Sequence, residues 1–213
     1  MLFVAAIGLV GRTAAAQDSL TFAHADRETA AALTKIVRTA SSRGLPVDPI
    51  VAKVQLAMVM HAPPARVIET AQAVADRLDV ARGAIAPDSL PADIAAGGDA
   101  LSFKVPKGLL TRIHQAAGGR AIAVPLGVLT QLVASNVPAD RAGDIVTKLM
   151  RQGATTEQLL ALGNDVNSDV QRGARPIESV ETRFRGLTPL LSPSGNSSVN
   201  ADAPAAASGP KKP

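Results

Sequence analysis

Residues 61–66 read HAPPAR, and the same pattern returns at residues 136–141 as NVPADR. In both stretches a proline is followed three residues later by an arginine, Arg66 and Arg141. Proline is tolerated in the first turn of a helix because its missing amide would have no partner there. Apolar residues then follow at the spacing of one helix face: Val67, Ala71, Val74 and Leu78 after the first stretch, and Ala142, Ile145, Val146 and Leu149 after the second. Each stretch is therefore predicted to be a corner between two helices, with one alternative left open, that Arg66 and Arg141 form a face for a common partner.

Three further stretches combine turn residues with a following apolar stripe: RGLPVD from residue 43, QGATTEQ from residue 152 and RGARPIES from residue 172. In the second of these, Thr155 and Gln158 have the spacing of a helix capping box. The pattern predicts a mainly α fold in which short helices joined by Pro/Gly corners form an irregular helical repeat or a bundle.

A second repetition lies closer together. Residues 105–113 read VPKGLLTRI, and residues 124–132 read VPLGVLTQL. Because the residue before a proline is biased away from helical geometry, the sequence allows a minimal two-stranded β element near 101–124. Just upstream, residues 86–100 hold two prolines, a glycine pair and several aspartates, which favours a linker or long loop.

These patterns divide the chain into five parts. We expect a signal peptide (1–16), an N-terminal helical group (17–85), the linker or long loop (86–100), a C-terminal helical group (101–185) and a disordered tail (186–213). The tail is assigned from its Ser, Pro, Gly, Asn and Ala content, which cannot bury enough apolar area to offset the entropy of ordering.

The N-terminal segment has the pattern of an export signal. An apolar run from Leu2 to Val10 is too short to span a bilayer, which takes about 20 residues. Ala14 and Ala16 match the small-residue pattern of signal-peptidase cleavage before Gln17. We therefore expect a periplasmic or secreted protein of bacterial type. No basic residue precedes the apolar run, so an uncleaved segment that anchors the protein in a membrane is the alternative.

Composition removes several classes of function. The chain of 213 residues has no cysteine, which excludes disulfides, thiolate nucleophiles and cysteine-bound metals. Aromatic residues make up 2% of it, too few to favour stacking platforms for nucleic acid. The formal charge of +4 comes from interspersed acidic and basic residues, so we expect a mixed surface and no nucleic acid partner.

The sequence contains no recognisable catalytic or cofactor motif. Its three histidines, His24, His61 and His114, do not have the spacing of metal ligands on one helix face, and we interpret them as surface residues. No serine-nucleophile motif or phosphate-binding glycine loop is present. No cofactor or metal is therefore expected.

Two carboxylate pairs lie at helical i, i+4 spacing: Asp140 with Asp144, and Asp165 with Asp169. Such pairs matter because two carboxylates suffice for glycoside cleavage. Each pair lies opposite the apolar stripe of its predicted helix, so we interpret both as solvated faces.

Three functions remain. We favour an exported, non-catalytic module of the cell envelope or periplasm, either structural or binding another protein or an envelope component through its helical corners and concave face. The first alternative is an anchored envelope protein that touches anionic lipid or cell-wall polymer through Lys104, Lys107, Arg112 and Arg120. The second alternative is an enzyme with an unrecognised site.

Overall fold

The computed structural model describes residue 22 and residues 25–86 and 89–191. Of these residues 78% are helical and none is in a strand, which confirms the predicted mainly α fold. The helices in chain order are α2 (Arg27–Ser42), α3 (Asp48–Val59), α4 (Pro64–Ile85), α5 (Pro91–Ser102), α6 (Lys107–Ala117), α7 (Ala123–Ala134), α8 (Ala139–Arg151), α9 (Thr156–Gln171) and α10 (Pro176–Leu191).

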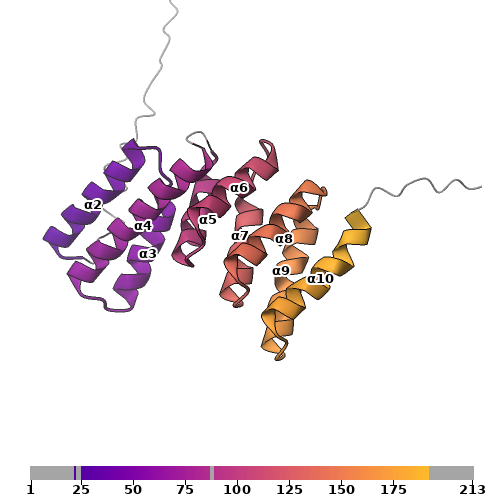
Figure 1. The fold of residues 1–213 in the computed structure, drawn as a ribbon. Coiled ribbons are helices and arrows are strands. Elements are labelled where there is room, and N and C mark those ends of the chain that lie inside the picture. The colour runs from indigo at the N-terminus through magenta and orange to yellow at the C-terminus, as the bar shows by residue number, and fades with distance from the viewer. Residues whose placement is uncertain (1–21, 23–24, 87–88, 192–213) are drawn as a thin grey trace, which may run out of the picture.

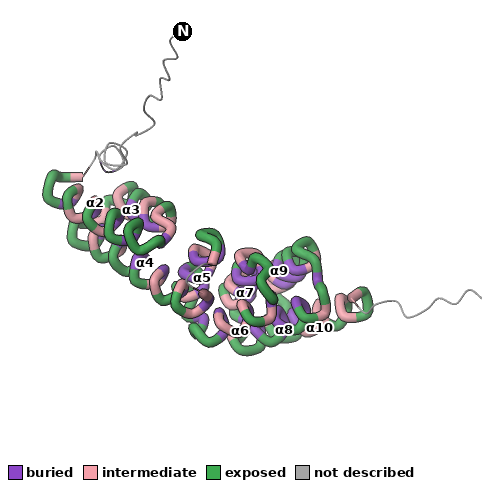
Figure 2. The backbone as a smooth tube through the Cα atoms, turned by 90° about the horizontal axis from the view of Figure 1, so that it is seen from above, coloured by how far each residue is buried: buried purple, intermediate pink, exposed green. Residues whose placement is uncertain are grey.

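The helices form two layers in an elongated array (Figure 1). In one layer α2, α4, α6, α8 and α10 contact one another in that order, and in the other layer α5 contacts α7, which contacts α9. Consecutive helices therefore alternate between the layers. Figure 2 shows the buried residues along the seam between the two layers and the exposed residues on the outside. The core is built from Ala, Val, Leu and Ile together with Phe22 and Met150.

Six of the eight corners share one backbone motif, which explains the sequence repetition. The second residue after the helix end is left-handed, and the amide that follows it donates to a carbonyl five residues earlier, as Ala62 N does to Ala57 O (3.0 Å) and Val137 N to Leu132 O (3.0 Å). His61 (φ 56°) and Asn136 (φ 64°) hold the left-handed positions in HAPPAR and NVPADR. The prediction that both stretches are helix corners is confirmed.

Polar side chains cap the starts of α2, α7 and α9. The capping box predicted at Thr155 and Gln158 is present at the start of α9. Helix α7 is capped from another helix: the buried Asp93 of α5 accepts hydrogen bonds from the amides of Ile122 (2.9 Å) and Ala123 (2.7 Å). This cap fixes the position of α5 relative to α7.

The two-stranded element allowed near 101–124 is not found. Val105 precedes a corner, where Pro106 is the N-cap of α6, whereas Val124 and Pro125 lie in the first turn of α7. The repeated VP pairs therefore have different places in the fold. Pro125 lies in the first turn, where its missing amide costs no hydrogen bond, and Val124 is helical there although the residue before a proline is biased away from helical geometry.

The linker expected at 86–100 is also wrong, because helix α5 begins at Pro91. Its glycine pair allows α5 to pack closely against α4. A Cβ on Gly97 would lie 3.0 Å from the Cβ of Ala81, and one on Gly98 would lie 2.8 Å from Leu78 Cδ2. The glycines thus bring α5 close to α4 and do not interrupt the helix.

At the C-terminal end, α10 continues to Leu191, so residues 186–191 are helical and do not belong to the predicted tail. The rest of the tail prediction lies outside the described residues. So do the signal peptide and its cleavage residues Ala14, Ala16 and Gln17. None of the helices of the described ranges is long and apolar enough to cross a membrane.

Candidate binding groove

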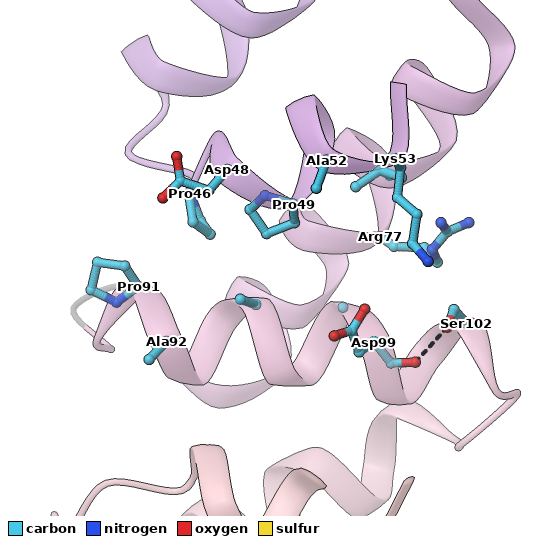
Figure 3. A pocket seen from close by; sticks show the side chains of 13 residues that line it. Pro46, Asp48, Pro49, Ala52, Lys53, Arg77, Pro91, Ala92, Asp99 and Ser102 are labelled. Carbon is cyan, nitrogen blue, oxygen red and sulfur yellow. Dashed lines mark hydrogen bonds between the residues drawn. The ribbon is translucent and has the colours of Figure 1, made fainter. Parts of the chain in front are cut away.

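An open groove lies between α3 and α5, with α4 as its floor (Figure 3). Its volume is about 780 Å³. It forms because α5 packs on α7 within its layer, whereas α3 packs chiefly on α4 and does not close against α5. The apolar part of the lining consists of small side chains and prolines: Pro46, Pro49, Ala52, Val74, Pro91, Ala92, Ala95 and Gly98.

The wall on α3 is an exposed helix face. Only Ile50 and Val54 of α3 are fully buried, against α4 and its neighbours. Ala52 lines the groove, Leu56 follows it one turn later on the same face of α3, and Met60 is the C-cap residue directly after the helix. Leu56 is 51% exposed and Met60 is 72% exposed. The apolar wall therefore continues beyond the groove toward the corner before α4.

The wall on α5 is lined by short side chains. Ala92, Ala95, Asp99 and Ser102 recur at the spacing of one helix face, and all four line the groove. The Ser102 hydroxyl donates to the Asp99 carbonyl (2.6 Å), which keeps that side chain against its own helix (Figure 3). Short side chains on this wall leave room between the helices for an added segment.

Charged side chains lie at the two ends of the groove. Asp48 is at one end, here called the Asp48 end; Lys53 and Arg77 are at the other, the Lys53 end, and Asp99 lies on the α5 wall nearer to them (Figure 3). None of these four forms an ion pair with another described residue. The groove thus combines an apolar lining with charges that have no partner among those residues.

A smaller hollow between α9 and α10, about 390 Å³, contains a paired carboxylate. Asp169 accepts from Ser179 Oγ (2.9 Å), from Arg183 Nε and Nη2 (both 2.8 Å) and from Arg172 Nη2 (2.6 Å). The hydrogen bonds from Arg183, and next that from Ser179, hold the pKa of Asp169 well below its ordinary value. Its side chain is 15% exposed. The interpretation of Asp165 and Asp169 as a solvated face is therefore wrong for Asp169, which joins α9 to α10.

This carboxylate does not resemble a catalytic acid or base. A general acid needs a raised pKa, and here the neighbouring arginines favour the ionised form. Of the other pair, Asp144 forms an ion pair with Arg112 (3.0 Å) and Asp140 is exposed. Histidine, aspartate and glutamate side chains form no group of three that could hold a metal ion in the part of the chain that the structure describes.

The two arginines considered as a binding face lie apart from the groove lining. Each is in the first turn of a helix in the layer opposite α3 and α5, Arg66 on α4 and Arg141 on α8. Arg66 pairs with Glu69 of its own helix (3.4 Å), and Arg141 pairs with Glu181 of α10 (3.1 Å). Helix α6 lies between α4 and α8 and contacts both (Figure 1), so the structure does not bring the two arginines together.

The four basic residues considered for a lipid or polymer surface have different environments. Arg112 pairs with an aspartate, as described above. Arg120 donates from Nε to Ala117 O (3.0 Å) and from Nη2 to Met150 O (3.3 Å), which ties the ends of α6 and α8 together. Only Lys104 and Lys107, around the corner before α6, form neither an ion pair nor a side-chain hydrogen bond with another described residue, so the four do not act as one cationic surface.

Sequence reasoning missed the groove because the α5 wall lies in the segment expected to be a linker. The signal was present in the short residues Ala92, Ala95 and Ser102, which have helical spacing. Comparison with protein-family models, curated proteins and solved structures finds no match to the chain.

Proposed function

We propose that the protein is an exported, non-catalytic binding module that holds a short helical segment of another protein in the groove between α3 and α5. The observation that carries this proposal is the open, largely apolar groove of about 780 Å³ between two helices of one layer. Ligand and peptide sites are characteristically concave, mainly apolar and supplied with a few polar groups.

A helix is the occupant that this groove fits best. Its walls are two helices of the same layer, so an added helix would continue the packing that α5, α7 and α9 already show. Helical segments bind such grooves through apolar residues at i, i+3, i+4 and i+7. The exposed Leu56 and Met60 extend the contact surface for such a stripe past the Lys53 end.

Binding rather than catalysis is supported by the polar groups of the groove. Its four charged residues come from three different helices and form no ion pair with one another. The most perturbed carboxylate of the described residues, Asp169, lies in another hollow and is held ionised. Export remains a proposal that rests on the segment from Leu2 to Gln17, and it directs the search for a partner to the cell envelope or beyond.

A peptide-display selection tests the function. The library presents amphipathic helices of about 14 residues, roughly four turns, with randomised faces. It is selected on the full chain and counter-selected on Ala95→Trp, which fills the groove. Ala31→Trp, on the exposed side of α2, serves as the matched control. Each variant is first checked by circular dichroism and urea denaturation.

We expect enriched peptides that bind the unchanged chain and Ala31→Trp alike but lose binding to Ala95→Trp. Enrichment of peptides that bind all three proteins equally, or failure to enrich any, would exclude the groove as a helix-binding site.

A further inference from the structure

We infer that the segment held in the groove carries an acidic end, which lies against Lys53 and Arg77. This inference rests on the proposed function and specifies the chemistry of the partner. The charges of the groove carry it, because they are unevenly distributed along its length and have no partner among the described residues.

Arg77 is the more informative of the two cations. It is flanked in sequence by Asp76 and Asp79, yet it pairs with neither. Asp76 accepts a hydrogen bond from a glutamine one turn earlier (2.8 Å), and Asp79 pairs with Arg43 and Arg82. The nearby carboxylates are thus engaged elsewhere, and Arg77, half-buried on the floor helix, lines the groove (Figure 3).

Lys53 lies at the same end of the groove as Arg77 but comes from α3, which forms one wall. Asp99 on α5 is the one carboxylate of the lining near these two cations, so this end has a surplus of positive charge (Figure 3). The far end has Asp48 alone among the charged lining residues. An acidic group on the occupant is therefore attracted to the Lys53 end and repelled from the Asp48 end.

A basic end on the occupant would be repelled from the Lys53 end. It would place like charges together at the Lys53 end, where an apolar wall lowers the local dielectric. Because Lys53 is exposed and Arg77 is half-buried, the discrimination is moderate. We expect about three- to tenfold in affinity between an acidic and a neutral end.

Three peptides test the inference. They share one apolar helical centre taken from the display selection and differ at one end, which is acidic, neutral or basic. Each is titrated into the full chain and into Lys53→Glu/Arg77→Glu by fluorescence anisotropy. Lys107→Glu/Arg151→Glu is the matched control, because it changes the net charge equally at two exposed cations outside the groove.

The expected order of affinity is acidic, then neutral, then basic. The order should reverse on Lys53→Glu/Arg77→Glu and persist on Lys107→Glu/Arg151→Glu. The differences in affinity among the three peptides should shrink between about 50 mM and about 500 mM salt, because salt screens the charges. Equal affinities for the three peptides, or an order that the reversal of Lys53 and Arg77 leaves unchanged, would overturn the inference.

The position of the acidic end is measured separately. The chain has no cysteine, so a single introduced one carries a nitroxide at a defined site. A label at Ser102→Cys should broaden the NMR resonances of the acidic end, and one at Pro46→Cys should broaden those of the other end. The reverse result would contradict the inferred orientation.

Failure of the inference and failure of the proposed function give different results. If all three peptides bind equally and Ala95→Trp abolishes their binding, the groove holds helical segments without selecting an acidic end. If Ala95→Trp leaves binding unchanged, both the proposed function and the inference are wrong.

Discussion

The close contact between α4 and α5 makes a quantitative prediction for the pair Gly97 and Gly98. Both are buried in the middle of α5. A Cβ on Gly97 would lie 3.0 Å from the Cβ of Ala81, which cannot rotate away, and one on Gly98 would lie 2.8 Å from a methyl group of the buried Leu78. In Gly97→Ala/Gly98→Ala the two helices must therefore move apart or distort.

Two opposing effects set the magnitude. Overpacking a buried site costs about 1–3 kcal/mol, hence about 2–6 kcal/mol for the pair if the sites add. Replacing glycine by alanine inside a helix returns about 1 kcal/mol at each position. We expect a net loss of about 0–4 kcal/mol in the free energy of unfolding.

A matched control removes the helix-propensity contribution. Gly127 of α7 and Gly186 of α10 also lie inside helices, but a Cβ at either meets no atom within 4 Å. Gly127→Ala/Gly186→Ala should therefore stabilise the chain by about 2 kcal/mol. The difference between the two double variants isolates the packing cost, about 2–6 kcal/mol.

Urea denaturation followed by circular dichroism measures this difference directly. A gap near zero between the two double variants would refute the packing argument, because glycines in a loose linker tolerate alanine. Equal m-values in the two variants are required for the comparison.

Three further predictions address charge, capping and corner geometry. Because the pKa of Asp169 is lower in the folded chain than in the unfolded one, its pairing stabilises the fold above about pH 4, and this contribution is lost as the pH falls. Urea denaturation should show a deficit for Asp169→Asn that shrinks on acidification, whereas Asp140→Asn, at an exposed carboxylate, should show no such deficit. Asp93→Ala removes the buried acceptor of two amides at the start of α7. It should lower the free energy of unfolding by about 2–3 kcal/mol and speed hydrogen exchange at those amides. Asp93→Asn keeps an oxygen acceptor and should lower the free energy of unfolding by less. Lys104→Gly should stabilise the chain by about 0.5–1 kcal/mol because Lys104 has φ 63°, and Gly153→Ala, at φ 81°, should destabilise it by a similar amount in thermal or urea denaturation.

The corners could be predicted because their causes are local. A corner is determined within a few positions by a left-handed residue, a buried apolar residue, and a proline or a capping residue. His61 and Asn136 are the left-handed residues of two such corners. The linker and the β element were wrong because the deciding contacts are distant in sequence. The glycine at position 97 is explained by Ala81, which lies against it in the folded chain, and the helix that contains Val124 is capped at its start by Asp93.

The groove follows from a mismatch between the apolar composition of α3 and how little of α3 is buried. A helix that is apolar on all sides is expected to be buried on all sides, and α3 has apolar residues around most of its circumference. Yet only Ile50 and Val54 are fully buried, while Leu56, Val59 and Met60 are 51%, 73% and 72% exposed. The fold supplies neighbours for one face of α3 and leaves the second apolar face beside an open groove. A partner helix in that groove would give this face the contacts that the described residues do not provide.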